Sequence, residues 1–219
     1  MNRNMSRTLF AILALALASL GCSVLSALPG SGSVLEDDFS SGDSWGTSTD
    51  SSSSIEYADG GLQMQIFTDN YFVWSTPNTE SYENIHIEVT VKNNDTPATT
   101  AFGIICHQQT VSDSFYYLVM TPAGEYAIAR AALAQTDIFL TNNDQWAASD
   151  SIAQNAPSYR LGADCGNGIL TLYVDGQQIA SVSDSSYTAG VVGLLTWSGE
   201  EASSANVTFD DFVVTKLQQ

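Results

Sequence analysis

Apolar residues recur at every second position through most of the chain. Between Ile85 and Lys92, for example, Ile and Val residues alternate with His, Glu, Thr and Lys. A period of two is typical of a β-strand with one buried face, and such runs follow each other about every ten residues from residue 34 onward. The runs that predict strands are 62–66, 85–92, 102–106, 115–120, 125–131, 159–165, 169–174, 191–197 and 207–215.

The clearest turn signals lie in residues 161–184. The tripeptide 166–168 (Gly-Asn-Gly) precedes the run 169–174, and Asp175-Gly176 follows it. Asp-Gly between two alternating runs favours a two-residue type I′ turn, because both central residues need positive φ. The sequence therefore predicts three consecutive antiparallel strands here, with Leu170, Leu172 and Val174 on one face.

No convincing helix is predicted after residue 34, and residues 138–152 form a strand-poor excursion without clear periodicity. Many short strands without intervening helices indicate an all-β sandwich or barrel and argue against a βαβ fold. We predict that residues 34–217 form one such domain.

The first 21 residues predict a signal peptide. Arg3 and Arg7 precede the apolar run 9–20, which is shorter than the about 20 residues that a transmembrane helix needs. The segment 19–22 (Ser-Leu-Gly-Cys) resembles the bacterial lipobox, in which signal peptidase II cleaves before a cysteine that becomes lipidated. The alternative is ordinary cleavage by signal peptidase I.

Lipidation of Cys22 would place the protein outside the cytoplasmic membrane, anchored in the cell envelope by lipid alone. Residues 22–33 are rich in Ser and Gly, which is typical of a flexible tether. We therefore predict a lipoprotein-type signal peptide at 1–21, a tether at 22–33 and the β-domain at 34–217.

The charge of the chain is strongly acidic. The sequence has 6 Lys and Arg against 24 Asp and Glu, a formal net charge of −18. Without Arg3 and Arg7 of the signal peptide, four basic residues face 24 acidic ones, which gives −20. Such a surface repels phosphate backbones, so we exclude nucleic acid as a partner; anionic lipid surfaces are disfavoured for the same reason.

Three cysteines are present. If Cys22 carries the lipid, Cys106 and Cys165 remain as an even pair in an oxidising compartment, and we predict a disulfide between them. The alternative is two buried free thiols.

Several short motifs occur in an order that is known from one superfamily. These motifs are Asp37-Asp38-Phe39-Ser40, Trp45, Tyr57, Gly60, Leu62 and Met64, Phe102-Gly103-Ile104-Ile105-Cys106, Phe115-Tyr116-Tyr117, Gly124, Tyr126 and Ile128, Asn167, Leu170, Leu172, Asp175-Gly176, Gly190, Gly193-Leu194, Val207 and Phe209-Asp210-Asp211-Phe212. In this order they resemble the concanavalin A-like lectin/glucanase superfamily, especially its laminin-G-like and 3-keto-disaccharide hydrolase-type jelly rolls. The resemblance spans residues 34–217 and implies a two-sheet antiparallel jelly-roll sandwich; its motifs are mostly structural and imply no particular activity.

No catalytic residue is predicted. Laminarinase-type relatives carry an E-x-D-x-(x)-E pattern on one strand, and this chain lacks it. Residues 42–46 match G-x-S-x-G, but they lie in a Ser/Gly-rich loop and lack the strand and helix that a nucleophile elbow requires. His86 and His107 lack the spacing of a metal-binding pair.

Calcium is the one cofactor that the resemblance suggests. Asp37 and Asp38 lie on the first predicted strand, Asp210 and Asp211 on the last, and in the superfamily these strands are usually neighbours. Carboxylate oxygens suit Ca²⁺. The alternative is that each Asp points outward or caps a turn.

Sugar binding would use exposed aromatic rings that stack on pyranose faces, with polar side chains for the hydroxyl groups. The candidates are Trp74, Tyr116, Tyr126, Arg130, Trp146 and Trp197. Because Tyr126 and Arg130 share a strand face with Ile128, that face is predicted to be partly core. The leading hypothesis is a non-catalytic carbohydrate-binding module whose partner is a polysaccharide or other glycan. The alternatives are a structural or adhesive surface protein that binds other proteins, and a glycan hydrolase.

Overall fold

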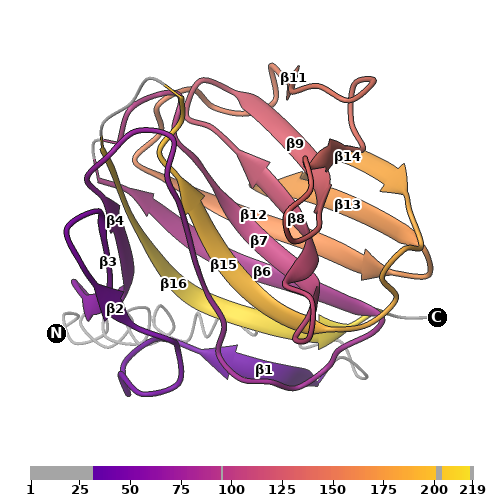
Figure 1. Ribbon diagram of the computed structural model, residues 1–219, viewed down its shortest axis with the longest axis horizontal. Coiled ribbons are helices and arrows are strands. Elements are labelled where there is room, and N and C mark those ends of the chain that lie inside the picture. Colours follow the sequence, from indigo (N-terminus) through magenta and orange to yellow (C-terminus); the bar gives the residue numbers. More distant parts are fainter. Residues whose placement is uncertain (1–31, 95, 201–203, 218–219) are drawn as a thin grey trace, which may run out of the picture. The chain divides into compact units, whose positions relative to one another are not determined.

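The computed structural model describes residues 32–94, 96–200 and 204–217, and these form two antiparallel β-sheets packed face to face (Figure 1). The all-β jelly-roll prediction is confirmed. The predicted signal peptide, Cys22 and the tether up to residue 31 lie outside the described residues. The described residues contain no helix that is long and apolar enough to cross a membrane.

The described strands divide between a larger and a smaller sheet. The larger contains β1 (Ser33–Asp37), β2 (Ser48–Thr49), β3 (Ser53–Ala58), β4 (Gly61–Ile66), β6 (Ile85–Asn93), β12 (Ser158–Gly166), β13 (Ile169–Val174), β14 (Gln177–Ser183) and β16 (Ala205–Lys216). The smaller contains β5 (Phe72–Ser75), β7 (Ala101–Gln109), β8 (Ser114–Met120), β9 (Glu125–Ala131), β10 (Ile138–Phe139), β11 (Ala147–Ala148) and β15 (Val191–Trp197). The order is β14-β13-β12-β6-β16-β4-β3-β2 in the larger sheet, with β1 on β16, and β10-β9-β8-β7-β15-β5 in the smaller, with β11 on β9.

The predicted hairpins between β12, β13 and β14 are present. Asp175 and Gly176 have φ values of 50° and 76°, as a turn with two left-handed central residues requires. Leu170, Leu172 and Val174 are buried, whereas Ile169 on the other face is 46% exposed. The alternation in the sequence therefore identified the core face of β13.

The core lies between the two sheets, and one covalent bond crosses it. Alternate residues from both sheets form one cluster of buried side chains, which includes Phe102, Tyr159 and Phe209. The predicted disulfide between Cys106 on β7 and Cys165 on β12 is present, with an S–S distance of 2.07 Å. Because β7 and β12 belong to different sheets, this bond links the two layers.

The outer face of the larger sheet carries a row of ion pairs around His86. The His86 Nδ1 atom lies 2.6 Å from Oδ1 of Asp164, and its Nε2 atom lies 3.3 Å from Oε1 of Glu88. Arg160 Nη2 lies 2.9 Å from Oε2 of the same Glu88, and the Tyr173 hydroxyl donates to Oδ2 of Asp164. The hydrogen bond to Asp164 raises the pKa of His86 above its ordinary value of 6.5.

This pKa shift predicts how stability depends on pH. A base whose pKa is raised by folding contributes stability that is fully present below pH 6.5 and is lost as the pH rises through the folded pKa. We expect the unfolding temperature of the wild type to fall by about 2 °C over that window. The variant His86→Gln should lack this fall when thermal unfolding is measured from pH 6 to 9.

Lys92→Gln is the matched control, because it removes another ion pair of the same face, that with Asp210, and leaves His86 and its partners in place. An identical fall in wild type and His86→Gln would contradict the assignment to His86.

Candidate functional site

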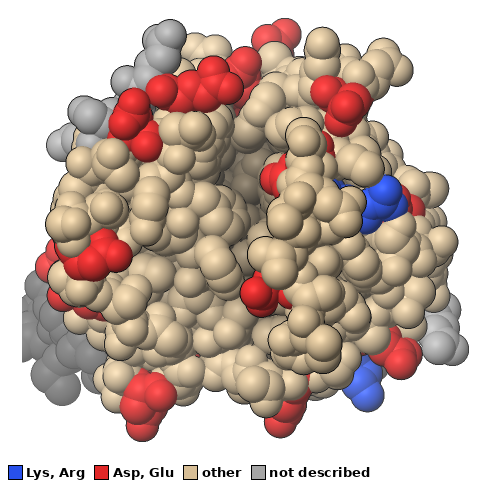
Figure 2. Space-filling model, viewed as in Figure 1, with Lys and Arg blue, Asp and Glu red and all other residues tan. Residues whose placement is uncertain are grey.

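The outer face of the smaller sheet forms a groove. Small side chains occupy alternate positions of β9 on this face, namely Ala127, Ala129 and Ala131, and Ala101 of β7 lies in the same cluster. Because these side chains are short, the surface in the middle of the sheet lies below the tips of the larger side chains around it. The resulting cavity has a volume of about 960 Å³, and Figure 2 shows the hollow in this face.

Aromatic rings from several elements line the groove. The lining rings are Phe72 and Trp74 of β5, Phe115 and Tyr117 of β8, Phe139 of β10, Trp146 before β11, and Trp197 of β15. Trp146 and Trp197 are stacked with ring centroids 6.2 Å apart and an interplanar angle of 17°. Trp74 is 42% exposed, so its ring is open to a ligand. The groove is thus surrounded by several flat apolar surfaces.

Polar groups are few in the groove and are placed beside the rings. Trp197 Nε1 donates to Oδ1 of Asn70 at 3.3 Å, and the Tyr117 hydroxyl donates to Oδ2 of Asp137 at 2.9 Å. Burial raises the pKa of Tyr117, and the charge of Asp137 adds to that shift. Burial also raises the pKa of Asp137. These groups could orient a polar ligand over the aromatic surfaces.

The structure brings three of the six predicted ligand residues into the groove: Trp74, Trp146 and Trp197. The other three do not line it. Tyr116 is fully buried between the sheets, and Tyr126 packs against the same core. Arg130 Nη1 lies 2.7 Å from Oδ2 of Asp184.

The physical reason is strand parity, because neighbouring residues point to opposite faces. On β8, Phe115 and Tyr117 face the groove while Tyr116 faces the core. Tyr116 has its pKa raised to about 12 by burial and by its hydrogen bond to Asp184. It is therefore a core residue with a satisfied hydroxyl group and offers no open ring for stacking.

The sequence prediction missed several groove residues, including Phe72, Phe115, Tyr117, Asp137 and Phe139. A usable signal existed for two of them. Phe115 and Tyr117 point to one face of β8, and Tyr116 points to the other. The alanines at every second position of the partner strand β9 indicate which of these two faces is the groove.

Three of the four aspartates proposed for calcium lie on paired strands, because Asp37 ends β1 and is opposite Phe212 of β16, which also carries Asp210 and Asp211. The prediction that Asp38 lies on the first strand is wrong, because Asp38 follows β1 and accepts a hydrogen bond from the Ser40 backbone N–H. Asp37, however, accepts hydrogen bonds from the Phe39 backbone N–H and from Trp45 Nε1. Asp210 pairs with Lys92 at 2.9 Å. Across residues 32–94, 96–200 and 204–217, no three or more His, Cys, Asp or Glu side chains form a metal-binding group. The residues as placed do not fit a calcium site, and calcium binding stays a prediction from the sequence.

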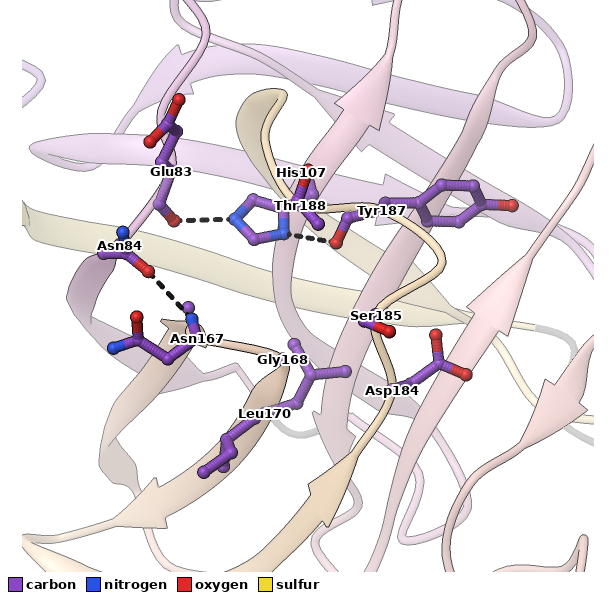
Figure 3. Close-up of a pocket in the computed structure, with 12 residues that line it drawn as sticks. Glu83, Asn84, His107, Asn167, Gly168, Leu170, Asp184, Ser185, Tyr187 and Thr188 are labelled. Carbon is purple, nitrogen blue, oxygen red and sulfur yellow. Dashed lines mark hydrogen bonds between the residues drawn. The ribbon is translucent and has the colours of Figure 1, made fainter.

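A second, smaller pocket of about 360 Å³ lies beside His107 (Figure 3). The His107 ring lies between two backbone carbonyl oxygens, with Nε2 2.8 Å from Glu83 and Nδ1 3.1 Å from Tyr187. Asn84 Oδ1 accepts a hydrogen bond from the backbone N–H of Asn167. These contacts hold three chain segments together, and both ring nitrogens of His107 lie against backbone carbonyl oxygens, which indicates a structural role for this histidine.

Comparisons with known proteins show the fold. No model of a known protein family matches the sequence, and no curated protein matches it. Among solved structures, the carbohydrate-binding module CBM66 from Bacillus subtilis is similar with a TM-score of 0.58 and 15% sequence identity, covering 79% of this chain and 96% of that one. A protein of unknown function with a galectin-like fold, also from Bacillus subtilis, has a TM-score of 0.58 and 12% identity, covering 86% and 100%.

A third similar structure is the kappa-carrageenase from Pseudoalteromonas carrageenovora in complex with an oligotetrasaccharide of kappa-carrageenan, with a TM-score of 0.57, 12% identity, and coverage of 87% and 97%. The chain therefore has the concanavalin A-like jelly-roll fold, as the motifs in the sequence implied.

Proposed function

We propose that the protein is a non-catalytic carbohydrate-binding module whose site is the groove on the outer face of the smaller sheet. The observation that carries the proposal is the lining of that groove by seven aromatic rings beside a few hydrogen-bonding groups. Flat rings stack on the apolar faces of pyranose units, while Asn70 and Asp137 can bond their hydroxyl groups. The similarity to a carbohydrate-binding module agrees with this proposal.

Two alternatives are weaker. An adhesive protein that binds other proteins would favour a flat and polar face, whereas this face is hollowed and aromatic. A hydrolase needs two carboxylates across its cleft, one of them protonated. Asp137, whose pKa is raised by burial, could be the protonated one, so the enzymatic alternative is included in the test below.

The proposal also includes the cellular location of the protein. Lipidation of Cys22 would hold the module at the cell envelope through the predicted tether that precedes β1. The support for this part is the lipobox-like sequence and the signal-peptide pattern that precedes it.

We expect single substitutions Trp74→Ala and Trp197→Ala to weaken binding to the preferred oligosaccharide by about tenfold to a hundredfold, since loss of one stacking ring costs about 1–3 kcal/mol. A glycan array identifies the oligosaccharide, and isothermal titration calorimetry measures the affinities. Phe67→Ala is the matched control, because Phe67 is 50% exposed and lies outside the groove.

Equal affinities for wild type and both Trp variants would overturn the assignment of the groove. The same incubations are analysed for new reducing ends. Their appearance with wild type, and their loss in Asp137→Asn, would replace the binding proposal by the hydrolase.

A further inference from the structure

The groove is acidic and has no cationic side chain. Its lining includes Asp113, Asp137 and Glu200, and among the described residues that line it there is no Lys, Arg or His. Figure 2 shows acidic side chains at the edges of the hollow, whereas the blue Lys and Arg side chains of this view lie away from it. Any ligand in the groove therefore meets negative charge that the groove itself does not neutralise.

Three of the four Lys and Arg side chains of the described residues form ion pairs away from the groove. Lys92 pairs with Asp210, Arg130 with Asp184 and Arg160 with Glu88. Burial by itself would raise the pKa of Asp184, but hydrogen bonds from Tyr116 and Ser186 and the charge of Arg130 bring it below its ordinary value. These three acids outside the groove are thus compensated by cationic partners within the protein.

Asp137 differs from these acids. It is partly buried beside the aromatic rings, and its Oδ2 atom accepts a hydrogen bond from the neutral Tyr117 hydroxyl at 2.9 Å. Burial raises the pKa of Asp137, and the hydrogen bond from Tyr117 offsets this only in part. A partly buried carboxylate without a cation is stabilised when a ligand brings one.

The aromatic surroundings favour the same kind of ligand. An ammonium group within about 6 Å of an aromatic ring is attracted to its face, and the attraction grows when water is excluded. Phe115 and Tyr117 lie next to each other, with ring centroids 6.2 Å apart, and Tyr117 also holds Asp137. Rings and carboxylate together form an environment for a cation.

We propose that the groove binds a glycan that carries free, protonated primary amines, with one ammonium group placed between Asp137 and the neighbouring aromatic rings. This inference rests on the proposed function, because it specifies the class of glycan for the same groove. A glycan with carboxylate or sulfate groups would meet Asp113, Asp137 and Glu200 and is repelled.

The test compares three oligosaccharides that share a β-1,4-linked glucose backbone: glucosamine oligomers with free amines, their N-acetylated counterparts, and unsubstituted cello-oligosaccharides. Calorimetric titration is performed at about pH 6, where the amines are largely protonated, with about 20 mM and about 500 mM NaCl. We expect the amine-bearing oligomer to bind about tenfold tighter than the other two at low salt, and this advantage to shrink at high salt.

Asp137→Asn should remove most of the advantage of the amine-bearing oligomer and leave the affinity for the neutral ones nearly unchanged. Asp43→Asn is the matched control, because it removes a carboxylate from an exposed loop outside the groove and should change nothing. Circular dichroism confirms that each variant is folded.

The outcomes separate the two proposals. Equal binding of all three oligosaccharides, with sensitivity to Trp197→Ala, would overturn the amine preference and leave the carbohydrate-binding proposal in place. An amine preference that survives in Asp137→Asn would overturn the role of Asp137. Failure of every glycan to bind would overturn both proposals.

Discussion

A variant in which Cys106 and Cys165 are both alanine is expected to lose about 4 kcal/mol of folding free energy. The disulfide closes a segment with a sequence separation of 59 residues, and opening such a loop raises the entropy of the unfolded chain. Both cysteines are fully buried and belong to different sheets, so the substitution also removes packing from the core. For a domain of this size the unfolding temperature should fall by about 10 °C, measured by calorimetry.

Reduction of the wild type provides the control. Dithiothreitol should shift its unfolding temperature toward that of the double variant and leave the double variant unchanged. If the oxidised protein and the double variant unfold at the same temperature, the disulfide does not stabilise the fold, and the entropic argument is wrong for this protein.

The periodic part of the chain was predictable because local chemistry and burial agree there. In β6, Ile85, Ile87, Val89 and Val91 are all buried, as their alternation with polar residues indicated. The disulfide was predictable because Cys106 and Cys165 remain as an even pair once Cys22 is assigned to the lipid, and because the signal peptide implies an oxidising compartment. Both predictions depend on local patterns and residue counts, which a single sequence carries.

The groove was only partly predictable, since it depends on which strands become neighbours. β5 pairs with β15, far along the chain, and this pairing brings Trp74 next to Leu195. The wall that contains Asp137, Phe139 and Trp146 comes from a region with two-residue strands and no clear period. A sequence pattern cannot place such a segment, because tertiary contacts rather than its own residues decide its path.

The location of the groove follows from how the other faces are used. The inner faces of both sheets are occupied by the core, and the polar outer face of the larger sheet carries the paired charges around His86 and Arg160. The outer face of the smaller sheet combines aromatic rings with alanine and glycine, a combination that neither a core nor a charged surface requires. Small residues in the middle of this face and large rings around them produce the groove.

Gly103 lies where β7 and β8 approach each other closely beneath the groove. We expect Gly103→Ala to destabilise the domain by about 3 kcal/mol. Gly103 lies on β7, opposite Val119 of β8 and Leu195 of β15. A β-carbon at this position would lie 2.0 Å from the Leu118 carbonyl oxygen and 2.9 Å from the Val119 Cα atom. Backbone atoms cannot rotate away as a side chain can, so β7 and β8 would have to separate below the groove.

The matched control is Gly162→Ala, in the middle of β12, where the nearest atoms belong to side chains: Tyr173 Cβ at 3.2 Å and His86 Cε1 at 3.5 Å. Alanine in place of glycine lowers the entropy of the unfolded chain, which stabilises the folded state by about 0.4–1 kcal/mol. This gain should offset much of the free-energy cost of the milder contacts at Gly162. Chemical denaturation of both variants should therefore show a large loss for Gly103→Ala and a change below about 1 kcal/mol for Gly162→Ala. Equal losses of stability in the two variants would mean that glycine is required in these strands for a reason other than the close approach of β7 and β8. The proposed link between that approach and the groove would then be wrong.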